Sequence, residues 1–93
     1  MQVYHVGKNI VVAQGVDGMV LITRPNMYGK LTTHGIKSIY DALAIASWME
    51  TRTQGRGKLV QDAFPNMDKE DREFLLSGIT PTEWNQMFRD GAE

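Results

Sequence analysis

Three short runs rich in β-branched residues occupy the first 24 positions, and this pattern constrains the fold more than any other part of the chain. The runs cover residues 3–6, 9–14 and 19–23, and their composition favours strands. Between the second and third runs stands the pair Asp17-Gly18, which is typical of tight hairpin turns. The pattern predicts a three-stranded antiparallel meander, and one face of such a sheet needs another element packed against it.

The segment 24–35 contains two Gly and one Pro and is long for a link without structure of its own. A short fourth strand at residues 30–33 would account for part of it. Further on, Ser38 and Asp41 match a capping box, with Ser38 as the N-cap and Asp41 at position N3 of a helix that runs to about Thr53. Because this helix is apolar nearly all the way round, we expect it to be central, between the sheet and the C-terminal third.

The C-terminal third predicts three short helices, at residues 59–64, 69–77 and 81–90. Pro65 ends the first helix, Asp68 is the expected N-cap of the second, and Gly78 lies at or near its C-cap.

The third of these helices has the most complete start signal. Thr80 is the expected N-cap, Pro81 stands at N1, Glu83 closes the capping box, and Ile79 is placed to staple against Trp84. The predicted fold class is therefore α+β: a small three- to four-stranded antiparallel sheet packed on a central helix, followed by three short C-terminal helices.

The chain has 93 residues, of which 42% are hydrophobic, and this size suits one domain with a single core. It contains no Cys, so disulfides, thiolate nucleophiles and sulfur-bound zinc are excluded, and a reducing compartment is expected. No apolar run reaches the length of a membrane span, and the first residues lack the pattern of a signal peptide. We expect one domain over residues 1–93, located in the cytoplasm and without a membrane partner.

The net charge of −1 conceals two halves of opposite sign. Residues 1–58 contain seven Lys or Arg and three Asp or Glu, whereas residues 59–93 contain three Lys or Arg and eight Asp or Glu. A soft joint between the basic and acidic halves is expected near residues 55–57, where two Gly flank Arg56. Such asymmetry bears on partners and association rather than on fold.

The acidic half also contains a recognisable pattern of residues. It reads Gln61-Asp62 with Pro65, then Arg72-Glu73-Phe74-Leu75 with Gly78-Ile79-Thr80-Pro81, and then Glu83-Trp84. This pattern resembles a box in short accessory proteins encoded by bacteriophages. The resemblance covers the last third of the chain and implies a phage origin, with a host cell as the site of action. It assigns no activity, cofactor or site residue.

The acids of this half have two interpretations. Several lie in the first turns of predicted helices, where the helix dipole favours negative charge, and this structural interpretation needs no partner. Alternatively, an acidic rim around an exposed aromatic anchor docks onto a basic partner and imitates nucleic acid by its charge. The candidate partner-binding residues are Asp68, Glu70, Asp71, Glu73, Glu83 and Trp84.

The basic half offers a nucleic-acid interface as the alternative. The turn 55–58 resembles a phosphate-binding loop only superficially, because Leu59 stands where such a loop needs Ser or Thr. A basic, Gly-rich turn can still contact phosphates. Tyr28, which lies between Arg24 and Lys30 in the sequence, can stack on nucleobases. The candidate nucleic-acid-binding residues are Arg24, Lys30, Arg52, Arg56 and Lys58.

Catalytic and metal chemistry have little support in the sequence. His5 and His34 are the only histidines and lack the carboxylate spacing of a metal site, and Ser38, Ser47 and Ser77 have no matched base. We expect a non-enzymatic protein without metal or cofactor that binds and modulates a host protein complex, as an inhibitor of host defence similar to an anti-CRISPR protein. The alternatives are a nucleic-acid-binding regulator and a virion or assembly component that associates with itself.

Overall fold

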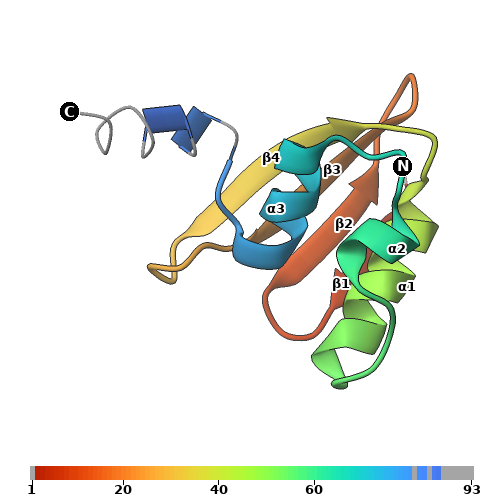
Figure 1. Ribbon diagram of the computed structural model, residues 1–93, viewed down its shortest axis with the longest axis horizontal. Helices are drawn as coiled ribbons and strands as arrows, with labels where there is room; N and C mark the ends of the chain where they lie inside the picture. The colour runs from red at the N-terminus through yellow and green to blue at the C-terminus, as the bar shows by residue number, and fades with distance from the viewer. Residues whose placement is uncertain (1, 81, 84, 87–93) are drawn as a thin grey trace.

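A computed structural model describes residues 2–80, 82, 83, 85 and 86 of the chain (Figure 1). Four strands come first and helices follow, so the predicted α+β class is confirmed. The elements are β1 (Val3–Val6), β2 (Ile10–Gln14), β3 (Met19–Pro25), β4 (Leu31–Lys37), α1 (Ala42–Thr53), α2 (Val60–Ala63) and α3 (Lys69–Ser77).

The strands form one antiparallel sheet in the order β1-β2-β3-β4, so every strand pairs with its neighbour in the sequence. The hairpin predicted at Asp17-Gly18 is confirmed: both residues have positive φ angles, of 56° and 77°, and the Met19 N–H donates to the carbonyl oxygen of Val16. This turn geometry matches the twist of the two strands that it joins.

The segment that we expected to be mostly loop is instead a second long hairpin. Strand β3 continues to Pro25, and β4 occupies seven residues, well beyond the predicted residues 30–33. Asn26 closes the turn, because its side-chain oxygen accepts hydrogen bonds from the N–H groups of Tyr28 and Lys30. An Asx turn of this kind holds a tight connection that a count of Gly and Pro does not reveal.

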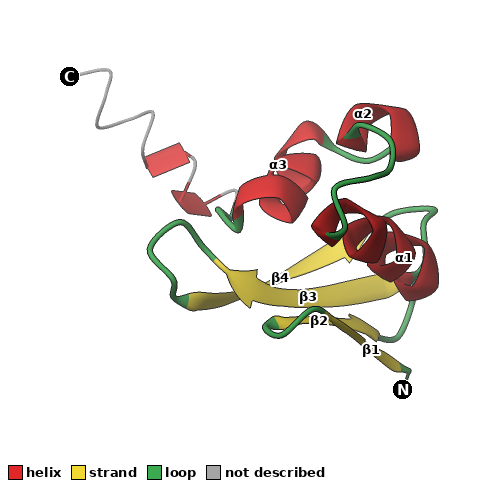
Figure 2. Ribbon diagram, turned by 90° about the horizontal axis from the view of Figure 1, so that it is seen from below, coloured by secondary structure: helices red, strands yellow, loops and turns green. Residues whose placement is uncertain are grey.

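The helices α1, α2 and α3 all lie on the same face of the sheet (Figure 2). Helix α1 packs on β1 and β2, and α3 lies beside α1 over β3 and β4, where Asp71 meets His34. The helices and the inner sheet face share one core, in which Val12, Val20, Ile22, Ile36 and Phe74 are 0% exposed. Helix α1 also contacts the segment around α2, because the Trp48 and Phe64 ring centroids lie 5.6 Å apart, whereas α3 lies beside α1. The expected enclosure of α1 between the sheet and the C-terminal helices is therefore not confirmed.

The start of α1 differs from the predicted one. Asp41, and not Ser38, is the N-cap, and its carboxylate accepts a hydrogen bond from the Ala44 N–H at 2.9 Å. The Ser38 hydroxyl instead accepts from the Tyr40 N–H within a local turn. Two candidate caps stood three residues apart, and the second satisfies the helix N-terminus. The predicted end of the helix at Thr53 is confirmed.

The first two of the three predicted C-terminal helices correspond to α2 and α3. Helix α3 has the predicted bounds and ends at Gly78 with a left-handed backbone, while α2 is shorter than predicted. In the capping box, Glu83 accepts from the Thr80 N–H and donates its own N–H to the Thr80 hydroxyl oxygen, as predicted. Pro81, Trp84 and residues 87–90 lie outside the described residues, and so does the predicted staple. None of the helices described has the length and apolar character needed to cross a bilayer.

Candidate functional site

The sheet face that no described helix covers is largely apolar. Strand register assigns side chains to it, because paired residues point to the same face and successive residues alternate. Six of its side chains are apolar and exposed or partly exposed, and we call this set the outer face: Val3, Val11, Ala13, Met19, Leu21 and Leu31. Leu21 in its middle is 38% exposed and Leu31 near its end is 59% exposed.

The outer face is continuous across the central strands. Gly35 of β4 has no side chain, and a Cβ built there would lie 3.0 Å from the Met19 sulfur and 3.4 Å from a Leu21 methyl carbon. Met19 and Leu21 therefore lie over the backbone of Gly35 and close the gap between β3 and β4. Beside them, the hydroxyls of Thr23 and Thr33 satisfy each other at 2.7 Å. The two hydroxyls on this part of the surface are therefore paired, whereas the exposed His5, opposite Val11, is a polar residue on the same side of the sheet.

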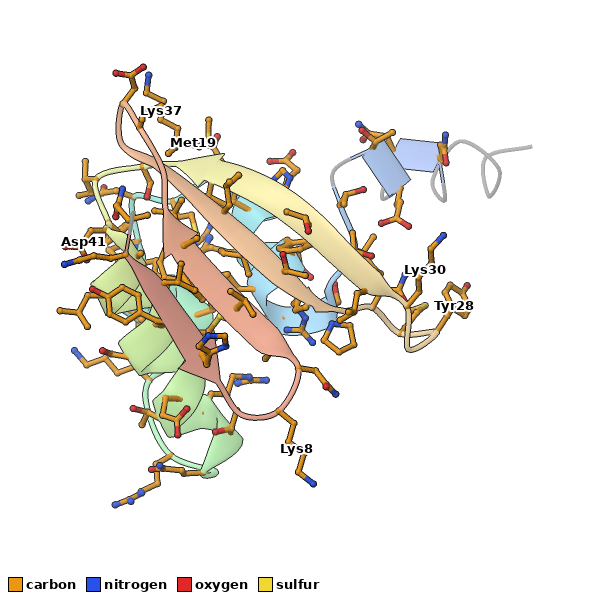
Figure 3. All side chains as sticks on the ribbon, turned by 180° about the vertical axis from the view of Figure 1, so that it is seen from behind. Lys8, Met19, Tyr28, Lys30, Lys37 and Asp41 are labelled. Carbon is orange, nitrogen blue, oxygen red and sulfur yellow. The ribbon has the colours of Figure 1, made fainter. Side chains whose placement is uncertain are left out.

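The charges that border the outer face are mostly positive. Lys37 pairs with Met19 across the two strands, and Lys8 and Lys30 stand in the turns at other corners of the sheet (Figure 3). Asp17, in the β2–β3 turn, is the one acid in the three hairpin turns. The outer face thus combines an apolar centre with a lysine-rich border.

A second feature is a cavity of about 230 Å³ on the opposite, helix-covered side. It lies between the start of β2, the end of β3, the last turns of α1 and the end of α3. Arg24 and Arg52 line it together with the side chains of Ile10, Trp48, Met49, Thr53, Leu75 and Leu76. Two cations therefore share a cavity whose walls are otherwise mainly apolar.

The two arginines are held in different ways. Arg24 is half-buried, and its guanidinium donates hydrogen bonds to the carbonyl oxygens of Pro25 and Leu75, which ties β3 to α3. Arg52 is exposed, and its Cζ lies 5.6 Å from the centroid of the Trp48 ring, as in a cation–π contact. Burial of Arg24 lowers its pKa below the ordinary value, and the positive charge of Arg52 lowers that pKa further.

The structure gathers part of the predicted basic set. Arg24 and Arg52 meet in the cavity, and the turn with Arg56 and Lys58 lies next to it, because the Lys58 carbonyl oxygen accepts from the Trp48 indole N–H at 2.9 Å. Lys30 is separate from them, beside Tyr28 at the tip of the β3–β4 hairpin (Figure 3). The five basic residues of the predicted interface therefore lie in two places. Arg24, Arg52, Arg56 and Lys58 lie near the end of α1, and Lys30 lies apart from them.

The predicted acidic set does not form an uninterrupted surface. Asp71 is engaged by His34, and Glu83 is engaged in the capping box with Thr80. Asp68 and Glu70 are exposed, and Glu73 is half-buried. Lys69 and Arg72 stand among them on α3, so positive charges interrupt the negative ones.

Two features of the structure were missed in the sequence. One is the outer face, although residues 10–13 and 19–22 are apolar at consecutive positions, a pattern that indicates strands with two apolar faces. The other is the cavity that Arg24 and Arg52 line together. The sequence contains no signal for it, because the position of Arg52 relative to Arg24 depends on how α1 packs on the sheet. Among the residues described, no three His, Asp or Glu side chains gather as a metal site.

Comparison of this chain with known protein families, with curated proteins and with solved structures found no match.

Proposed function

We propose that this protein is a non-enzymatic binding protein that attaches to a host protein complex through its outer face and modulates that complex. The observation that supports this function best is the uncovered apolar centre of the sheet, from Val11 and Ala13 to Met19 and Leu21. Contiguous apolar patches on a protein surface are typical of interaction sites, since exposure to water costs free energy that a partner can recover.

The border of the outer face specifies the chemistry of the partner. Lysines stand at three places around the apolar centre, so a complementary surface has an apolar middle and an acidic border. Charges at the border of an interface steer the encounter and select the partner, while the buried centre supplies most of the affinity. The partner is therefore a protein with a hydrophobic patch framed by Asp and Glu.

The proposed biological role is inhibition of a host defence complex. It rests on the resemblance of the last third of the chain to short phage accessory proteins and on the absence of a recognisable catalytic motif in the sequence. Charge mimicry by the acidic half contributes less to the proposal, because two of its candidate residues, Asp71 and Glu83, already have partners within the chain.

A pair of matched variants tests the outer face. Leu21→Glu places a charge in the centre of the face, whereas Leu59→Glu makes the same change at an exposed leucine that precedes α2. Wild type and both variants are used to capture partners from nuclease-treated bacterial lysate, with circular dichroism to check folding. We expect one stoichiometric protein that wild type and Leu59→Glu retain and that Leu21→Glu loses.

Three results would contradict the proposal. Equal capture by Leu21→Glu and wild type would show that the partner contacts another surface. Loss of every partner on nuclease treatment would favour nucleic acid as the ligand. Light scattering that shows a dimer of the wild type and a monomer of Leu21→Glu would mean that a second copy of this chain covers the outer face.

A further inference from the structure

We propose that the cavity between α1, α3 and the sheet is a binding site for a terminal phosphate group, which the guanidinium groups of Arg24 and Arg52 hold from two sides. This site is distinct from the outer face and does not depend on it, because the two lie on opposite sides of the sheet.

The charge of the cavity is the first argument. Among the residues that the structure describes, no carboxylate lies within 4 Å of either guanidinium, and the one contact between a carboxylate and a potentially cationic side chain joins Asp71 to His34. Two positive charges that face the same cavity repel each other, and burial makes Arg24 costly to keep charged. A bound anion would relieve both effects. A terminal phosphate, with close to two negative charges at neutral pH, balances two arginines better than a carboxylate does.

The geometry of the donors is the second argument. Arg24 uses its Nε and one Nη for the carbonyl oxygens of Pro25 and Leu75, and its second Nη remains for a ligand. These two bonds fix the guanidinium plane before a ligand arrives, which lowers the entropy lost on binding. Arg52 is exposed, and its guanidinium lies over the Trp48 ring, so its N–H groups remain for a ligand. Planar guanidinium forks bind phosphate oxygens in pairs, which suits both residues.

The walls of the cavity limit the size of the ligand. A volume of about 230 Å³ is smaller than most cavities that enclose a complete small molecule, so the site takes the phosphate and the atoms next to it. Leu75, Leu76 and Met49 provide apolar contacts for those atoms. The phosphate can come from a free nucleoside monophosphate or from the 5′ end of a nucleic-acid strand, since both present the same group.

The experiment uses titration calorimetry with three probes, which are adenosine 5′-monophosphate, a 5′-phosphorylated dinucleotide and the same dinucleotide with a 5′-hydroxyl. Saturable binding of the 5′-phosphorylated dinucleotide, and at least about tenfold weaker binding of the 5′-hydroxyl form, are expected, because the latter lacks the dianionic group. Equal binding of adenosine monophosphate identifies free nucleotides as a source, and its failure to bind identifies strand ends. Equal affinity for the two dinucleotides, or no binding of any probe, would overturn the proposal.

Arg52 is the residue to change, because Arg24 also joins β3 to α3 and its removal could unfold the protein. Arg52→Gln is expected to raise the Kd for the 5′-phosphorylated dinucleotide by about tenfold, through loss of a charge-assisted contact. Lys69→Gln removes the same charge from the exposed start of α3, outside the cavity lining, and is expected to change the Kd by less than about twofold. Equal weakening by both variants would show a diffuse basic surface and would contradict a site in the cavity.

Discussion

The imidazole of His34 on β4 lies 2.8 Å from the carboxylate of Asp71 on α3, measured from Nε2 to Oδ1. The two side chains are only 20% and 16% exposed, and the imidazole also contacts Phe74, with 5.0 Å between the ring centroids. These residues are 37 positions apart in the sequence. The contact therefore joins helix α3 to β4, which is an edge strand of the sheet.

We expect His34 and Asp71 to be energetically coupled. Asp71→Asn and His34→Gln should each lower the free energy of unfolding by about 1 kcal/mol, since each weakens a partly buried hydrogen bond. The free energy of unfolding of the double variant should fall by less than the sum of the two single losses, and this difference should be at least about 0.5 kcal/mol. Urea denaturation of the four proteins measures this. Asp68→Asn serves as the control, because Asp68 is exposed and its side chain makes no cap hydrogen bond. Additive losses would show that the two residues act independently.

A second prediction concerns the start of α1. Asp41→Ala should lower the free energy of unfolding by about 1 kcal/mol, because it leaves the Ala44 N–H without its side-chain acceptor. Ser38→Ala should cost less than about 0.5 kcal/mol, because the Ser38 hydroxyl serves only the turn before the helix. Thermal or urea denaturation distinguishes the two, and a larger loss for Ser38→Ala would restore Ser38 as the cap.

The elements that could be predicted from the sequence are those with strong local signals. Helix α3 was predicted to the residue, because Asp68 and Gly78 mark its ends and nothing nearby competes. The hairpin at Asp17-Gly18 and the capping box of Thr80 and Glu83 were predicted for the same reason. Where two signals competed, as Ser38 and Asp41 did, the choice depended on backbone geometry that the sequence does not show.

Long-range arrangements were beyond a prediction from pattern alone. Strand β4 is polar through Thr32, Thr33 and His34 and contains Gly35, and it forms because β3 pairs with it and Asn26 closes the turn. The pairing of His34 with Asp71 also follows from the docking of α3. In the acidic set, the sequence therefore showed the carboxylates without showing which of them already have hydrogen-bond partners within the chain.

The end of α3 provides a third prediction. Gly78 has φ of +78°, and a Cβ there would lie 2.5 Å from the Pro25 carbonyl oxygen and 2.8 Å from the Asn26 Cα. Gly78→Ala should therefore lower the free energy of unfolding by about 3 kcal/mol, through an unfavourable φ and overlap with backbone that cannot move. Gly55→Ala separates the two causes, because Gly55 has φ of +76° and open space around it, and should cost about 1 kcal/mol. Equal losses would mean that the backbone at residues 25 and 26 gives way.

The last prediction compares the two faces of the sheet at adjacent positions. Val12 points to the core and is 0% exposed, whereas Val11 belongs to the outer face and is partly exposed. Both are β-branched, as Thr is, so Val→Thr keeps the strand preference and replaces one methyl group with a hydroxyl. Val12→Thr should lower the free energy of unfolding by about 1–2 kcal/mol, because it buries a hydroxyl among apolar side chains. Val11→Thr should cost less than about 0.5 kcal/mol, because water can still reach that hydroxyl.

Urea denaturation of these two variants also bears on the proposed function. A small loss for Val11→Thr would mean that folding does not need the outer face covered, so its apolar side chains remain available to a partner. If Val11→Thr lowered the free energy of unfolding as much as Val12→Thr does, the outer face would already be covered in the free protein. The partner surface would then have to be sought elsewhere, and the cluster of Arg24, Arg52 and Arg56 at the end of α1 is the next surface to test.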